Sequence, residues 1–108
     1  MRTRLFFVAI AAGALLWALG PSTAAYQVTI DNFTFAPATV TVPAGAQITW
    51  LNRDDEPHKV VSTGGAFAAS PVLDTGEHYS VSLAKPGTYD YYCSMHPKMT
   101  GKIVVTPR

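Results

Sequence analysis

Short segments in which apolar and polar residues alternate recur along the chain, and they constrain its fold more than any other feature. A period of two puts one set of side chains on the buried face of a strand. Turn sequences such as Pro43-Ala44-Gly45 and Lys85-Pro86-Gly87 separate these segments, and no helical stripe interrupts them after residue 25. We therefore expect an all-β fold, either an antiparallel Greek-key β-sandwich or a small barrel. The expected inward-facing residues are Val28 and Ile30, Val40 and Val42, Ile48 and Trp50, Tyr79, Val81 and Leu83, Tyr89, Tyr91 and Cys93, and Ile103 and Val105.

The first 25 residues have a different composition from the rest. Arg2 and Arg4 precede an apolar run from residue 5 to residue 19, and small residues follow as far as Ala25. This pattern is typical of a secretory signal peptide, and the run is shorter than the roughly 20 residues of a membrane span. We expect a signal peptide over residues 1–25, cleaved near Ala25, and one domain over residues 26–108, exported to the periplasm and not inserted in the membrane. An uncleaved tether is the alternative.

The remaining domain is small and nearly neutral. Removing 25 of the 108 residues leaves 83, close to the size at which a single core is marginal. The leader holds two of the eight Lys and Arg residues and none of the seven Asp and Glu residues, so the domain carries a net charge of −1. We expect a monomer that does not bind nucleic acid, because no basic stripe is present. A single Cys cannot form an internal disulfide, whereas a bound metal could stabilise a domain of this size.

One segment near the C-terminus carries the chemistry. Cys93, His96 and Met99 follow one another at intervals of three residues. Each has an ordinary interpretation alone: a buried thiol, a surface imidazole and a core filler. Together they offer a thiolate, an imidazole and a weak thioether, a donor set that suits copper better than zinc, calcium or magnesium. A further His is needed, and His58 lies in a strand-like segment, whereas we expect His78 to face solvent.

Several motifs resemble those of the cupredoxins, the type 1 blue-copper electron carriers, most closely the branch of amicyanin, pseudoazurin and plastocyanin. The resemblance covers residues 27 to 106 and implies a cupredoxin-like sandwich that holds one type 1 copper ion. It implies His58, Cys93 and His96 as the strong ligands and Met99 as the axial ligand. The motifs are Thr49-Trp50-Leu51-Asn52-Arg53, Pro57-His58, Gly87-Thr88-Tyr89-Asp90-Tyr91-Tyr92-Cys93, and the continuation from Cys93 to Lys102.

One position departs from the family pattern. Many cupredoxins have Asn directly after the first His ligand, where its side chain braces the Cys loop, and this chain has Lys59. A brace of this kind orients the ligands and tunes the metal. We therefore expect the site to persist with an altered reduction potential or loop rigidity.

The resemblance also implies how the protein meets its partners, which would be redox proteins such as a dehydrogenase and a c-type cytochrome. His96 would present its ring edge at an apolar patch made by Pro57, Met95 and Pro97, with Phe67 as a further candidate. The run Asp54-Asp55-Glu56 could steer a basic partner, or it could be a solvated turn.

Two other functions are compatible with these residues. A copper-delivery protein would carry the ion and not the electron, and it would release the ion quickly. The other is an enzyme with Cys93 as nucleophile and His58 or His96 as base. In such an enzyme Met99 would have no role, and a chain this small has little room for a substrate cleft. An immunoglobulin-like disulfide is excluded because its second Cys is missing. Four protein ligands leave no open position for a substrate, so we expect an electron carrier and not an enzyme.

Overall fold

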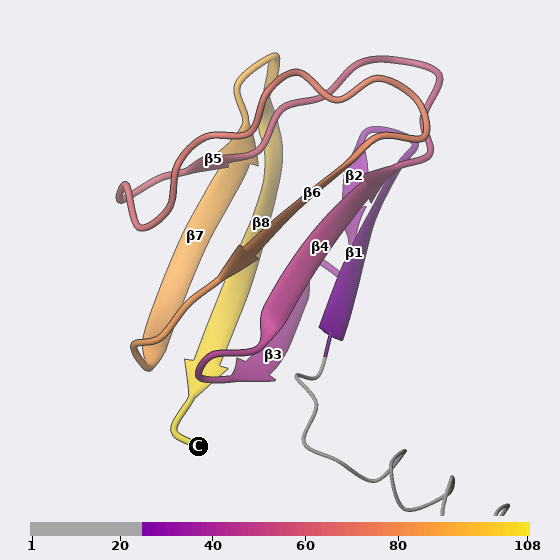
Figure 1. The fold of residues 1–108 in the computed structure, drawn as a ribbon. Helices are drawn as coiled ribbons and strands as arrows, with labels where there is room; N and C mark the ends of the chain where they lie inside the picture. Colours follow the sequence, from indigo (N-terminus) through magenta and orange to yellow (C-terminus); the bar gives the residue numbers. More distant parts are fainter. Residues whose placement is uncertain (1–24) are drawn as a thin grey trace, which may run out of the picture.

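The computed structural model describes residues 25–108, which form eight strands and no helix (Figure 1). No segment of this part of the chain is a helix that could cross a membrane. The predicted signal peptide lies outside the described residues, apart from Ala25, the first residue of β1. The strands are β1 (Ala25–Asp31), β2 (Thr34–Ala36), β3 (Thr39–Pro43), β4 (Gln47–Asn52), β5 (Val61–Ser62), β6 (His78–Ser82), β7 (Gly87–Cys93) and β8 (His96–Thr106).

The strands make two four-stranded sheets that pack face to face (Figure 1). One sheet has the order β2-β1-β4-β6 and the other has the order β3-β8-β7-β5. Every connection from β2 to β7 passes from one sheet to the other, while β1–β2 and β7–β8 are hairpins within a sheet. The prediction of an all-β sandwich is confirmed, and the barrel alternative is wrong.

Two pairings differ from the antiparallel expectation. β1 pairs with β4 in parallel, and β3 pairs with β8 in parallel, whereas the other ladders are antiparallel. Parallel neighbours need a long crossover connection, and here the crossovers run through the opposite sheet. Alternation alone could not reveal this, because it specifies the buried face of a strand and not the direction of its neighbour.

Most of the expected inward-facing residues form the core between the sheets, whereas Tyr79, Val81 and Tyr89 are only partly buried against it. Ile48 and Trp50 of β4 are fully buried, and Tyr91 and Cys93 of β7 face them from the other sheet with at most 1% of their surface exposed. Trp50 and Tyr91 pack edge to face, with ring centroids 5.2 Å apart. The buried end of β7 therefore carries Cys93 at the edge of a rigid aromatic core.

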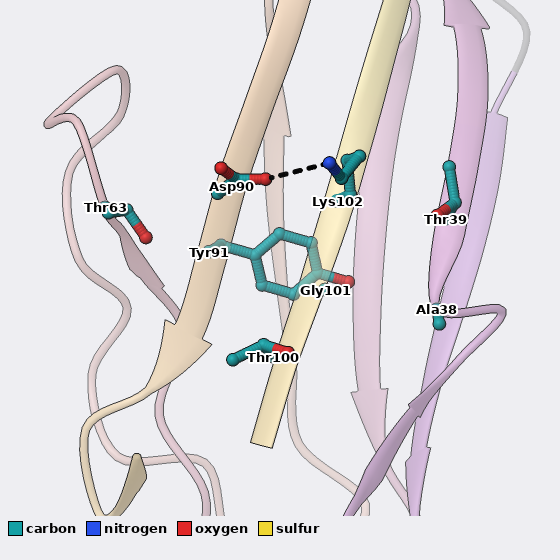
Figure 2. Close-up of a pocket in the computed structure, with 8 residues that line it drawn as sticks. All are labelled: Ala38, Thr39, Thr63, Asp90, Tyr91, Thr100, Gly101 and Lys102. Carbon is teal, nitrogen blue, oxygen red and sulfur yellow. Dashed lines mark ion pairs between the residues drawn. The ribbon is translucent and has the colours of Figure 1, made fainter. Parts of the chain in front are cut away.

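Tyr91 also accounts for a glycine on the neighbouring strand. Gly101 of β8 is paired directly with Tyr91, whose ring lies across it (Figure 2). Burial raises the pKa of Tyr91 to about 12, so its hydroxyl stays neutral. A groove of about 500 Å³ passes these residues and includes the exposed ion pair of Asp90 and Lys102, 3.5 Å apart. None of the residues that line this groove is a predicted metal ligand.

Candidate metal centre

Cys93 and His96 face each other across a tight hairpin. Cys93 ends β7, His96 begins β8, and the two residues are paired, so that only Ser94 and Met95 form the turn. The next pair joins Tyr92 to Thr100, which leaves residues 97 to 99 of β8 without counterparts in β7. Such a bulge bends its strand and re-aims its side chains. Residues 97 to 99 are therefore an irregular part of β8.

His58 reaches the same place from a distant segment. Its N–H donates to the carbonyl of Leu73 at 3.0 Å, and its carbonyl accepts from the N–H of Leu73 at 2.7 Å. Val60, two residues after His58, is held in the same way. Ser70 donates its N–H to the carbonyl of Val60, and the Ser70 hydroxyl accepts the Val60 N–H at 2.8 Å. The segment from residue 63 to residue 77 is a loop, as expected, and its part near Ser70 and Leu73 holds His58 in place.

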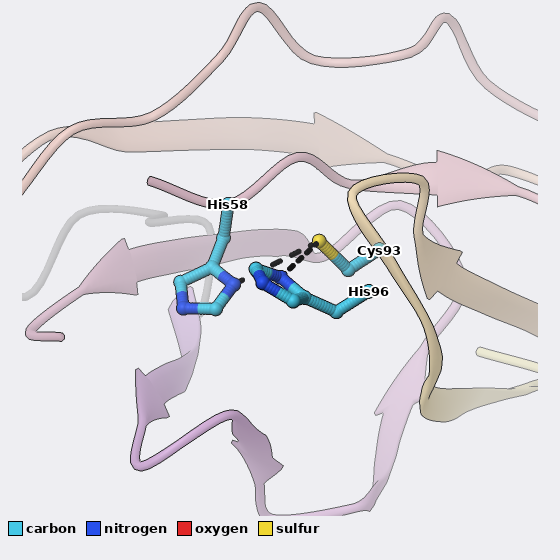
Figure 3. Close-up of side chains that lie close together, drawn as sticks. All are labelled: His58, Cys93 and His96. Carbon is cyan, nitrogen blue, oxygen red and sulfur yellow. Dashed lines mark hydrogen bonds between the residues drawn. The ribbon is translucent and has the colours of Figure 1, made fainter. Parts of the chain in front are cut away.

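These two segments bring three of the four predicted ligands together (Figure 3). Cys93 Sγ lies 3.7 Å from His58 Nδ1 and 3.8 Å from His96 Nδ1. The three donor atoms all lie within 4.8 Å of one another. A metal bound at about 2.0 Å to nitrogen and about 2.3 Å to sulfur, with an angle near 120°, would separate those atoms by about 3.7 Å. The spacing therefore fits a single trigonal metal ion.

The remaining two candidates occupy different environments. Met99 is buried, with 6% of its surface exposed, in the same core cluster as Cys93 and three residues after His96 on β8. His78 is exposed at the start of β6, as expected, and is not one of the three clustered ligands.

Asp54 holds the far side of the His58 ring. Asp54 Oδ2 lies 2.8 Å from His58 Nε2, so the ring can donate a hydrogen bond to the carboxylate while Nδ1 faces Cys93. Burial alone would raise the pKa of Asp54, but hydrogen bonds from the N–H of Phe33, the His58 ring and the N–H of Asn32 outweigh it and hold that pKa below 3.8. A carboxylate in this place fixes both the tautomer and the orientation of a metal-binding imidazole.

This arrangement corrects the interpretation of the acidic run. Asp54 is 9% exposed and makes no solvated acidic surface, whereas Asp55 and Glu56 are exposed. Any steering field at this edge therefore comes from Asp55 and Glu56. The spacing of four residues between Asp54 and His58 was the one signal in the sequence that could have indicated their contact.

The backbone of Lys59 contacts the sulfur of the site. The Lys59 N–H donates to Cys93 Sγ at 3.3 Å. Because this donor belongs to the main chain, it does not depend on the side chain at position 59. A hydrogen bond to a ligand sulfur is one of the factors that set the potential of a copper–thiolate site.

Phe33 is the aromatic residue beside the imidazoles, and the sequence did not indicate it. Its ring packs edge-on against His58 and His96, with centroid distances of 5.5 Å and 5.0 Å. The expected candidate, Phe67, instead packs against Trp50 in the core, at 5.6 Å. Phe33 lies in a turn with no periodic pattern, so only its place in the fold reveals its role.

The chemistry of the donor set identifies the metal that it fits. Two imidazoles and a cysteine sulfur within 4.8 Å of one another, with the buried thioether of Met99 three residues after His96, form a donor set that suits copper in the type 1 class. The Nδ1 atoms of both His residues face the sulfur of Cys93, and Nε2 of His58 contacts Asp54 instead. One type 1 copper ion fits these residues.

Comparisons with known proteins agree with this geometry. Residues 5–105 match the family model for a cupredoxin-like domain. Amicyanin-alpha of Methylorubrum extorquens is 38% identical over 101 residues, which cover 90% of this chain and 85% of that protein. A purple cupredoxin from Nitrosopumilus maritimus superimposes with a TM-score of 0.70 at 31% identity, over 75% of this chain and 99% of that one. The Cu(I) form of an amicyanin variant gives 0.71 at 34% identity, over 82% of this chain and 88% of that one. With the strand order and the clustered ligands, these matches show that this chain belongs to the cupredoxin family.

Proposed function

We propose that this chain is a small exported type 1 copper protein that carries single electrons between redox proteins. The observation that carries the proposal is the convergence of His58, Cys93 and His96 within 4.8 Å from two distant segments. His58, Cys93 and His96 would hold the ion, and the thioether of Met99 would be the fourth, weaker ligand. A bound copper ion would supply the one-electron couple between Cu(I) and Cu(II).

The surrounding residues would keep the ligands still while the charge of the site changes. Asp54 holds the His58 ring through Nε2, and the bridge to Leu73 holds its backbone. The Lys59 N–H holds the thiolate of Cys93. A site whose ligands do not move needs little rearrangement on electron transfer, so it would suit a carrier better than an enzyme that must admit a substrate.

The face around His96 would meet the partner. Met95 is 43% exposed, Pro97 is exposed, and the His96 ring is half-buried beside them. With Pro57 and Phe33 they would form a small apolar surface, which suits the weak and short-lived contacts of redox encounters. We propose that a dehydrogenase and a c-type cytochrome are the partners. We also propose that the chain is a monomer in the periplasm and that a signal peptide over residues 1–25 directs it there.

The visible spectrum of the copper-loaded chain tests the proposal. An intense thiolate-to-Cu(II) band should appear and should vanish in Cys93→Ser and His58→Ala. Met99→Leu should keep the band and shift the reduction potential, because the axial ligand tunes that potential. His78→Ala is the matched control, because His78 is exposed and outside the cluster, and it should keep the band.

Two results would contradict the proposal. A copper-loaded chain with no intense visible band has no type 1 site. A chain that shows the band but loses copper to a chelator within one redox cycle is a delivery protein and not an electron carrier.

A further inference from the structure

The turn between β1 and β2 has an unusual residue at its second position. Asp31 pairs with Thr34, so Asn32 and Phe33 alone make the turn, and their φ angles are 51° and 58°. Two-residue hairpins of this hand favour Asn followed by Gly, because a left-handed conformation is unfavourable for other residues. Asn32 follows this preference. Phe33 does not, so its side chain must contribute through contacts outside the turn.

Asp54 stabilises this strained turn and the metal site with the same carboxylate. Its Oδ1 accepts the N–H of Asn32 at 3.0 Å, and its Oδ2 accepts the N–H of Phe33 at 2.9 Å. The same Oδ2 lies 2.8 Å from His58 Nε2. The backbone of the turn is therefore fixed relative to the His58 ring.

The Phe33 side chain completes the connection. Its ring meets both imidazoles at an interplanar angle of 80°, which is the edge-on geometry that aromatic rings favour. His58 is also held by Asp54 and Leu73, whereas His96 lies on the half-buried hairpin beside the turn of residues 94 and 95. Of the two His ligands, His96 has less support from its own segment, and Phe33 packs against it.

We propose that Phe33 is a positioning residue for the metal site, and that its ring, held by the Asp54-bound turn, keeps the His96 imidazole in its binding orientation. This inference rests on the proposed copper site. Edge-on aromatic contacts contribute about 0.5–1.5 kcal/mol beyond the burial of area, which corresponds to about a two- to tenfold change in an equilibrium or rate. The ring thus slows the loss of the reduced metal and contributes to the reduction potential.

The test compares Phe33→Gly and Phe33→Tyr in the copper-loaded full chain. Glycine suits the turn, so Phe33→Gly should keep the fold, the thermal stability of the metal-free chain and the visible band. It should release Cu(I) to a chelator about two- to tenfold faster and shift the midpoint potential. Phe33→Tyr keeps the ring and should behave like the parent chain. Val72→Ala, at a position that is 47% exposed, is the surface control and should change neither quantity.

The outcomes separate this inference from the proposed function. A parent chain without the band overturns the copper site itself. A parent with the band and a Phe33→Gly chain that releases Cu(I) at the parent rate, with the parent potential, overturns the role of Phe33 alone. Equal acceleration in Phe33→Tyr and Phe33→Gly also overturns it, because the ring would then not be the cause.

A double-mutant cycle tests the link to Asp54. Asp54→Asn should accelerate Cu(I) release less in the Phe33→Gly background than in the parent, because part of its effect acts through the Phe33 ring. Simple additivity of the two changes would contradict that link.

Discussion

Asp54 Oδ2 lies 2.8 Å from His58 Nε2, and this contact joins a buried carboxylate to a fully buried ligand of the site. His58 has no exposed surface, so its ring depends entirely on protein partners for its orientation. Nδ1 faces the thiolate of Cys93, and Nε2 faces Asp54, which fixes both ends of the ring. Several properties of the chain follow from this contact and from the elements that surround it.

Loss of the Asp54 charge should destabilise the metal-free chain in a pH-dependent way. The pKa of Asp54 is below 3.8 in the folded chain, so its contribution to stability is present above 3.8 and is lost as the pH falls through the lower folded value. Asp54→Asn should lower the free energy of unfolding by about 2 kcal/mol at neutral pH, the range for hydrogen bonds to a charged group. Thermal unfolding at a series of pH values measures this difference, which should shrink in strong acid. A difference that stays constant with pH would show that the charge is not the cause.

Lys59→Asn should leave the visible band unchanged. The donor to Cys93 Sγ is the backbone N–H of residue 59, and both side chains keep it. The substitution removes a positive charge near the site, so it should favour the more positive oxidised state and lower the reduction potential, by about 1 kcal/mol or less. Spectroscopy with a redox titration checks both results. Lys59→Met removes the charge without adding an amide and should give the same shift, whereas a shift in Lys59→Asn alone would indicate a side-chain brace.

The sequence predicts those parts of the site that follow from the alternation of a strand or from a fixed residue spacing. Alternation places Cys93 on the buried face of its strand, and the interval of three residues brings His96 back to the sulfur across the hairpin. The role of Phe33 and the contact of Asp54 with the turn of Phe33 were not predictable in this way. Both depend on a contact between a turn and a segment about 20 residues away, and no local pattern specifies such a contact.

The direction of the strands was not predictable for a related reason. Val28 pairs with Trp50 in a parallel ladder, and Val40 pairs with Ile103 in another. The strands that carry these residues nevertheless alternate like antiparallel strands with one buried face. The burial of one face decides the alternation, whereas the connections through the opposite sheet decide the direction. The direction of a strand therefore follows only from the topology of the sheets.

Ser70→Ala should loosen the segment that carries His58. The Ser70 hydroxyl accepts the N–H of Val60 at 2.8 Å, and both residues are buried, with 2% and 0% of their surface exposed. Removal of the hydroxyl leaves a buried N–H without this partner, which should cost about 1–3 kcal/mol of the free energy of unfolding. Copper should also be released faster, because Val60 is two residues from His58. Ser82→Ala, at an exposed position, is the control and should stay within about 0.5 kcal/mol.

Gly101→Ala should destabilise the chain through a single clash. A Cβ at position 101 would meet the ring carbons and the hydroxyl of Tyr91, which is 1% exposed and packed against Trp50 and Phe35, so the ring cannot move aside freely. Forcing extra volume into a packed core costs about 1–3 kcal/mol, measured as the free energy of unfolding in denaturant.

Two matched variants isolate that clash. Gly64→Ala adds the same methyl group where no atom lies within 4 Å, and it should be neutral or slightly stabilising because it restricts the unfolded chain. Tyr91→Leu removes the ring, so Gly101→Ala should cost less in that background than in the parent. An equal cost in both backgrounds would mean that the backbone of β8, and not the Tyr91 ring, requires glycine at this position.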